Sequence, residues 1–87
     1  MKITKIVIEK EIERKILYKH NITLFEIEEA IFTSPYILKS RDNRYMAINW
    51  VQKYITIIFE LIKDIAFIIT AYPSSDSQRK LYKHKKQ

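Results

Sequence analysis

Glycine and cysteine are both absent from this chain of 87 residues. Without cysteine, it has no disulfide framework and no thiolate metal site. Without glycine, it has no phosphate-cradling glycine loop, which excludes the P-loop and dinucleotide-binding folds. Any turn that needs a positive φ must use another residue, and asparagine and aspartate tolerate that geometry best. We therefore expect left-handed backbone at four candidate turn positions: Asn21, Asn43, Asn49 and Asp64.

Long apolar runs are also missing, because charges or turns interrupt each run before it reaches membrane-spanning length. The first residues, MKITKIVIEKEIERK, alternate and then become charged, so they lack the apolar region and cleavage site of a secretory signal. The two histidines are far apart, and no zinc or calcium spacing is present. The sequence therefore predicts a cytoplasmic protein with no membrane attachment, no metal site and no cofactor.

Basic residues are in excess. Sixteen Lys and Arg against ten Asp and Glu give a formal net charge of +6, and five of the basic residues lie between Arg79 and Lys86. Such a balance favours binding to nucleic acid, to an anionic membrane surface or to an acidic protein. It also favours simple solubility, so the charge alone does not choose among these partners.

Hydrophobic spacing predicts a single α+β domain over residues 1–87, since the chain is too short for two independent cores. The alternation of residues 2–8 predicts a short N-terminal strand. Three apolar residues at helical spacing predict a helix over residues 9–20. Asn21 should end this helix, because asparagine tolerates the left-handed cap geometry.

A second helix and a sheet are predicted in the rest of the chain. Thr23 and Glu26 form a capping-box pattern, so a helix should begin there and end near Phe32, before Ser34-Pro35. Four strands follow, and their connections are too short for parallel crossovers, which predicts an antiparallel meander. The predicted strands and a final basic helix are 36–40, Arg44–Trp50, Tyr54–Ile62, Ile65–Pro73 and Asp76–Lys86.

The strands differ in how deeply each should be buried. In the strand over residues 54–62, Ile55 and Ile57 alternate with Thr56 and Ile58, which predicts one buried face and one partly wet face. Residues 65–71 are nearly all apolar, which predicts a central strand that is covered on both faces. Three aromatic residues are expected in the core or in an interface: Trp50, Phe59 and Phe67.

Three segments, taken in order, match the pattern of a known family. They are Lys19-His20-Asn21-Ile22 with the following LFEIEEA, then Arg44-Tyr45-Met46-Ala47-Ile48, and finally Ile68-Ile69-Thr70-Ala71 with Arg79, Leu81 and Tyr82 beyond it. These segments resemble the "KHGV-sFeEA", "RYLAIG" and "IISAR…R-LY" segments of BrnT-type ribonuclease toxins from type II toxin–antitoxin systems. These toxins fall within the RelE-like and barnase-like superfamily of small ribonucleases.

The resemblance implies a RelE-like fold, with a short N-terminal strand, two N-terminal helices, a four-stranded antiparallel meander and a short basic C-terminal helix. It also implies an endoribonuclease that cleaves RNA without a metal. A cognate protein antitoxin would neutralise this activity, and an acidic antitoxin would suit the positive charge of the chain. Oligomeric state does not follow from the resemblance.

RNA cleavage without a metal uses the neighbouring 2′-hydroxyl as nucleophile, so it needs groups that transfer protons and cations that stabilise the phosphate. Histidine titrates near neutrality, arginine binds phosphate bidentately, and a tyrosine can assist proton transfer or stack on a base. On these grounds and on the resemblance, the candidate catalytic residues are His20, Arg44, Arg79 and Tyr72. The candidate RNA-binding residues are Lys19, Arg41, Ser75, Lys80, Tyr82 and Lys83.

Several of these residues have a structural alternative. His20 could interact with the last carbonyls and the dipole of its own helix. Arg41 could form a salt bridge, for example to Asp42. Ser75 could cap the last helix, and Tyr82 could anchor that helix to the sheet.

Two other interpretations of the function remain open. The chain departs from the BrnT pattern at Tyr72-Pro73, where the family carries two basic residues, and at Gln78, where it carries a glutamate. A catalytically impaired member of the same fold that binds nucleic acid or an antitoxin would show such departures. The third possibility is a structural interaction module whose surface matches an acidic antitoxin.

Overall fold

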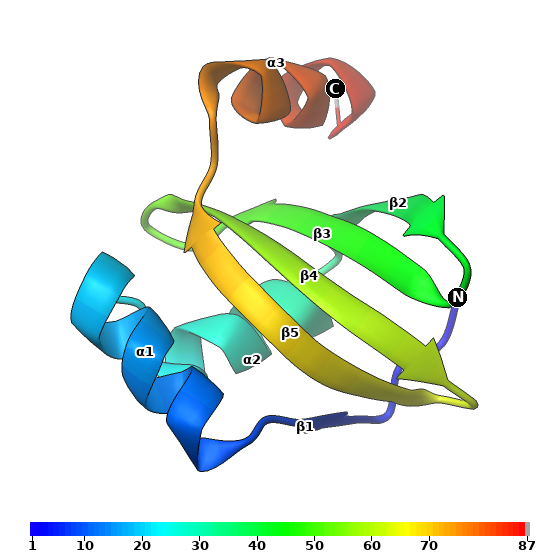
Figure 1. Ribbon diagram of the computed structural model, residues 1–87. Helices are drawn as coiled ribbons and strands as arrows, with labels where there is room; N and C mark the ends of the chain where they lie inside the picture. Colours follow the sequence, from blue (N-terminus) through cyan, green and yellow to red (C-terminus); the bar gives the residue numbers. More distant parts are fainter. Residues whose placement is uncertain (87) are drawn as a thin grey trace.

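The structure is a computed structural model that describes residues 1–86. Within that range it has three helices and one five-stranded sheet (Figure 1). The elements in chain order are β1 (Lys5–Val7), α1 (Lys10–His20), α2 (Leu24–Phe32), β2 (Tyr36–Arg41), β3 (Arg44–Trp50), β4 (Tyr54–Ile62), β5 (Ile65–Pro73) and α3 (Asp76–Lys86). The predicted α+β order is therefore confirmed, including the predicted bounds of β3, β4, β5 and α3.

The sheet has the order β1-β5-β4-β3-β2. Strands β2 to β5 form the predicted antiparallel meander, and β1 pairs with β5 in parallel, which makes the sheet mixed. β1 can pair in parallel because it is far from its partner along the chain: α1, α2 and strands β2 to β4 all lie between β1 and β5.

Two helices and the sheet enclose the main core. Figure 1 shows α1 and α2 on one face of the sheet and α3 across the opposite face. Apolar residues at helical spacing on α1 and α2 meet the inward residues of β4, among them Ile16, Ile27, Ile55, Ile57 and Phe59. All five are buried, so the expected core position of Phe59 is confirmed. Burial of this kind contributes roughly 1.5–3 kcal/mol for each large side chain.

Strand β5 contains a β-bulge that changes which side chains face the helices. Phe59 pairs with Ile68 and Ile58 pairs with Thr70, so Ile69 is an extra residue on β5. Because an extra residue reverses the alternation of a strand, Ala71 rather than Thr70 joins the core. Phe67 on the other face stays partly exposed. The predicted central position of β5 is confirmed, because β1 and β4 flank it, but on the face toward α3 the side chains of Phe67 and Thr70 are only half-buried.

The turns take their positive φ values from unexpected residues. Of the four expected positions only Asn21 is confirmed, with φ 54° as the C-cap of α1. In the β2–β3 hairpin Asp42 has the positive φ that was expected of Asn43, and in the β4–β5 hairpin Lys63 has it in place of Asp64. Asn49 lies inside β3. The positive-φ residues within residues 1–86 are Asn21, Ser34, Asp42, Gln52 and Lys63.

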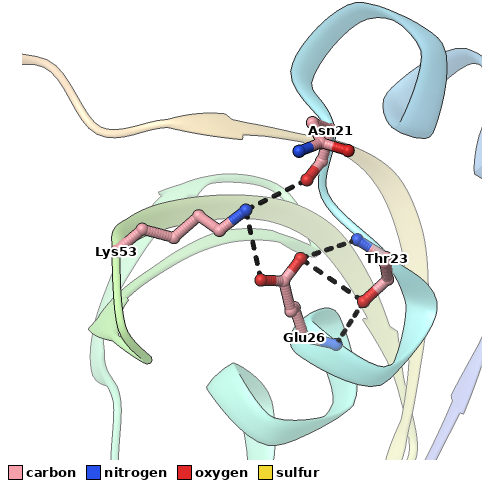
Figure 2. Close-up of polar contacts among 4 residues, drawn as sticks. All are labelled: Asn21, Thr23, Glu26 and Lys53. Carbon is pink, nitrogen blue, oxygen red and sulfur yellow. Dashed lines mark hydrogen bonds and ion pairs between the residues drawn. The ribbon is translucent and has the colours of Figure 1, made fainter.

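A polar cluster joins the α1–α2 connection to the β3–β4 loop (Figure 2). The capping box is present as predicted, because Thr23 Oγ1 accepts from Glu26 N at 3.1 Å and Glu26 Oε1 accepts from Thr23 N at 2.9 Å. Lys53 Nζ lies 3.1 Å from Glu26 Oε2 and donates to Asn21 O at 3.0 Å. Partial burial raises the pKa of Glu26, but the Thr23 amide and the Lys53 ammonium together hold it below its usual value.

This pKa shift predicts an acid-dependent contribution to stability. A carboxyl whose pKa is lowered by folding stabilises the protein above its ordinary pKa and loses that contribution as pH falls through the folded value. Glu26→Gln should therefore unfold more easily at pH 7, by about 0.5 kcal/mol. The difference should vanish well below pH 4.5, the ordinary value of this group. Urea denaturation at several pH values measures it, with exposed Glu28→Gln on the same helix as control. A difference that persists in acid would contradict the assignment.

No helix within residues 1–86 is long and apolar enough to cross a membrane.

Candidate functional site

A capping box fixes the first turn of α3. Gln78 N donates to Ser75 Oγ at 3.2 Å, and Ser75 N donates to Gln78 Oε1 at 2.9 Å. Serine and glutamine three residues apart suit this reciprocal arrangement. The structural alternative for Ser75, the capping of the last helix, is therefore confirmed. An RNA contact by Ser75 stays a prediction.

The same glutamine connects α3 to three strands. Gln78 Oε1 accepts from Thr56 Oγ1 at 3.0 Å, and Gln78 Nε2 donates to Tyr72 Oη at 3.1 Å and to Met46 Sδ at 3.6 Å. The Ser75 N–H needs an acceptor, and in the Gln78 side chain only Oε1 can accept. This contact determines the orientation of the amide, so the NH₂ group of Gln78 faces Tyr72. The oxygen of the Tyr72 phenol is therefore an acceptor here. Its O–H can donate to a further acceptor.

The bulge in β5 is what places Tyr72 beside α3. Simple alternation from the buried Ala66 and Ile68 would turn Tyr72 toward α1 and α2. Because Ile69 is an extra residue, Tyr72 points to the α3 side, opposite Thr56 of β4. The side-chain position of this candidate catalytic residue therefore depends on one irregularity of the strand.

The pairing of residues between strands shows which side chains are neighbours on the α3 side of the sheet. Ile48 of β3 lies opposite Thr56, so Tyr72, Thr56 and Ile48 form one row across three strands. Toward one end of β3 lies Arg44, and toward the other end lies Trp50. This face therefore presents a cation at one end, a phenol in the middle and an aromatic side chain at the other end.

Exposed basic side chains surround this face. Arg41 and Arg44 are both exposed and lie directly opposite each other on β2 and β3, an arrangement in which like charges repel. On α3, Arg79 forms an ion pair with Asp76, and the neighbouring Lys80 is exposed. The ion pair that Arg41 was expected to form as its structural alternative is not among the described contacts of residues 1–86.

Comparison with known proteins identifies the fold. No protein-family model matches the chain, and no curated protein matches it. Among solved structures, the 1.1 Å crystal structure of the Brucella abortus ribonuclease toxin BrnT matches with a TM-score of 0.70 and 20% identity. The match covers 84% of this chain and 99% of that one. This chain has the BrnT fold. The fold expected from the three sequence segments is thereby confirmed.

Within this BrnT fold, the candidate catalytic residues fall on two sides of the sheet. Arg44, Tyr72 and Arg79 belong to the α3 side. His20 is the last residue of α1, which packs on the opposite face, and Lys19 is exposed beside it (Figure 1). The structure therefore brings three of the four candidates to one side and leaves His20 on the other.

Net charge is also unevenly distributed over this BrnT fold. The first 35 residues, which form β1, α1 and α2, carry six basic and six acidic residues. Residues 36–87, which form the rest of the sheet and α3, carry ten basic and four acidic residues. The whole net charge of +6 therefore comes from the part of the BrnT fold that holds Arg44, Tyr72 and Arg79. Such a distribution attracts polyanions to that part.

Asn49, which is not among the predicted site residues, joins the two helical layers. Its side chain is 3% exposed, and Nδ2 donates to the carbonyl oxygens of Ala30 at 2.9 Å and Thr33 at 3.0 Å. Its Oδ1 accepts from Trp50 N at 2.8 Å and from Tyr82 Oη at 3.0 Å. The predicted anchoring role of Tyr82 is thus confirmed. The signal that indicates Asn49 is a polar residue at an inward position of an otherwise apolar strand.

Proposed function

We propose that this protein is a metal-independent endoribonuclease that acts as the toxin of a type II toxin–antitoxin system. The observation that carries the proposal is the Tyr72 phenol, which Gln78 orients on the basic side of a fold shared with a ribonuclease toxin. The phenol, the arginines and the aromatic residues are the kinds of group that RNA cleavage requires.

In the proposed reaction, the 2′-hydroxyl loses its proton to water, its oxygen bonds to the adjacent phosphorus, and the bond from that phosphorus to the 5′-oxygen breaks. Tyr72 donates its proton toward the leaving oxygen, because its own oxygen already accepts from Gln78. Arg44 and Arg79 stabilise the negative charge that develops on the phosphate.

We assign proton transfer to Tyr72 rather than to His20, because α1 lies on the opposite face of the sheet from α3. His20 and Lys19 then serve as RNA contacts outside the reaction, or as the cationic end of α1. The remaining proposed RNA contacts are Arg41, Ser75, Lys80, Tyr82 and Lys83.

Contact between Tyr72 and Gln78 also supports an active enzyme over an impaired one. These are two of the positions at which the chain departs from the BrnT pattern, and they are hydrogen-bonded to each other. A basic residue and a glutamate would form a charged pair there, whereas this chain has a neutral pair. A coupled exchange of this kind keeps the contact and supplies a proton donor.

A cognate antitoxin is the second part of the proposal. Residues 36–87 carry an excess of six positive charges, which favours an acidic partner over this part of the surface. The partner would cover the same residues that bind RNA, so it would block the reaction.

Incubation of the purified protein with single-stranded RNA in EDTA tests the proposal. The wild type should cleave the RNA and leave 2′,3′-cyclic phosphate ends, because attack by the 2′-hydroxyl forms that ring. Arg44→Ala and Arg79→Ala should each lower the rate about tenfold or more, because each removes a cation from the developing charge. Arg14→Ala, an exposed residue of α1, is the matched control.

Three outcomes separate the candidate functions. RNA that stays intact in EDTA, with or without the substitutions, would contradict the ribonuclease. Intact RNA together with an RNA affinity that falls steeply with salt would instead support the catalytically impaired, nucleic-acid-binding alternative. Cleavage lost in His20→Ala but kept in Tyr72→Phe would move the proton transfer to α1.

A further inference from the structure

The β3–β4 hairpin end of the sheet carries an exposed tryptophan. The Trp50 side chain is 53% exposed, so of its two expected places, the core or an interface, the core is excluded. Its ring meets the Tyr54 ring edge-on, at 6.5 Å between centroids and 67° between planes. Tyr54 in turn meets Tyr82 of α3 edge-on at 5.9 Å and 74°. The three rings therefore form a row of edge-on contacts, and the Trp50 side chain at its outer end is more than half exposed.

Positive charge adjoins these rings. Lys83 Nζ lies 5.6 Å from the centroid of the Tyr54 ring, within the range of a cation–π contact. The two segments that supply these side chains, residues 50–59 and 77–87, contain no aspartate or glutamate and contain six basic residues. An anionic ligand with a flat apolar part fits such a surface.

We propose that Trp50 and Tyr54 form a stacking site for an unpaired base of single-stranded RNA, with Lys83 contacting the adjoining phosphate. Every base has a π-face, so stacking of this kind tolerates any sequence. Bases inside a duplex are already stacked, so the site selects single strands. The proposal rests on the proposed function, because it takes RNA as the ligand.

The site lies within reach of the proposed reaction centre. Tyr54 is two residues from Thr56 on β4, a distance of about 7 Å along a strand. Thr56 is the register partner of Tyr72. A nucleotide stacked on Trp50 and Tyr54 therefore brings a phosphate a short distance along the strand to Tyr72.

Trp50 is the only tryptophan of the chain, which makes it a reporter of its own site. A short 2′-O-methyl oligouridylate is the probe, because the blocked 2′-oxygen prevents cleavage while the bases remain free to stack. Its titration into the wild type should quench the tryptophan fluorescence. Binding measured by anisotropy of a labelled probe should weaken about tenfold in Trp50→Ala and much less in Trp50→Phe.

Two further variants control the interpretation. Phe25→Ala removes a ring that is 71% exposed on α2, outside the proposed site, and should bind the probe as the wild type does. Lys83→Ala should reduce the slope of log affinity against log salt by about one phosphate contact. Urea denaturation of each variant confirms folding, and Trp50→Phe keeps an aromatic ring beside Tyr54.

The proposal is overturned if Trp50→Ala binds the probe as tightly as the wild type, or if saturation leaves the fluorescence unchanged. A second result also overturns it: the Trp50 fluorescence changes with protein concentration in the absence of probe, and sedimentation equilibrium shows a dimer that Trp50→Ala abolishes. In that case the surface is a contact between two copies. Quenching by the probe combined with intact natural RNA would contradict the ribonuclease and leave the stacking site standing.

Discussion

Tyr72→Phe should cleave RNA at least about 100-fold more slowly than the wild type, because it removes the proton donor and keeps the ring. The Gln78 NH₂ group loses its acceptor on the phenol, but this pair is only part-buried, so stability should fall by no more than about 1 kcal/mol. The loss should appear mainly in kcat, since substrate contacts elsewhere on the face remain. Single-turnover cleavage in EDTA measures it, with Tyr18→Phe as control, a tyrosine 91% exposed on α1.

Gln78→Glu tests how Tyr72 is oriented. A carboxylate can still accept from Ser75 N and Thr56 Oγ1, so the start of α3 should remain intact. At Tyr72, however, a carboxylate oxygen replaces the NH₂ group and can only accept a hydrogen bond. The Tyr72 O–H then donates to this carboxylate. We expect Gln78→Glu to fold normally and to lose most of the activity. A Gln78→Glu protein as active as the wild type would refute the orientation, and an active Tyr72→Phe would refute the role of the phenol itself.

Asn49→Ala should lower the free energy of unfolding by about 3 kcal/mol, the largest effect expected from a polar residue of this protein. The substitution leaves the carbonyl groups of Ala30 and Thr33 and the Trp50 amide without the partner they have now. It also releases Tyr82, and with it one attachment of α3. Urea denaturation measures the loss.

Two further variants help to interpret the loss of stability in Asn49→Ala. Tyr82→Phe removes only the bond to α3 and should lower stability by about 1 kcal/mol. Asn43→Ala removes an exposed asparagine from the β2–β3 turn and should change it by less than about 0.5 kcal/mol. Should Asn49→Ala prove no more destabilising than Asn43→Ala, the side chain would not hold the two layers together.

Much of the fold follows from local rules that a single sequence carries. The spacing of Ile55, Ile57 and Phe59 determines which face of β4 is buried, and Thr23 with Glu26 determines where α2 begins. Two- and three-residue connections leave β2 to β5 no option but antiparallel neighbours. These features depend on residues close together in the chain, which is why the predicted bounds of β3, β4, β5 and α3 agree with the structure.

The candidate site is less predictable because its contacts join residues that are distant in sequence. Nothing local indicates that Gln78 reaches Thr56 and Tyr72, or that Asn49 bonds to α2 and α3 together. His20 matched a motif in the sequence, and only the packing of α1 on the other face separates it from Tyr72. The register of the sheet and the layer to which each helix packs decide these relations.

The amino-acid sequence is sufficient to predict an α+β chain without disulfide or glycine loop, its antiparallel meander and a basic closing helix. Composition and short-range spacing suffice for these because hydrophobic period and turn length act locally. The orientation of Tyr72 toward α3 follows only from tertiary pairing, because the extra residue Ile69 reverses the alternation of β5 and is defined by the pairing of β5 with β4. Tertiary packing likewise leaves Trp50 more than half exposed, although it lies at the end of β3 on the α3 side of the sheet.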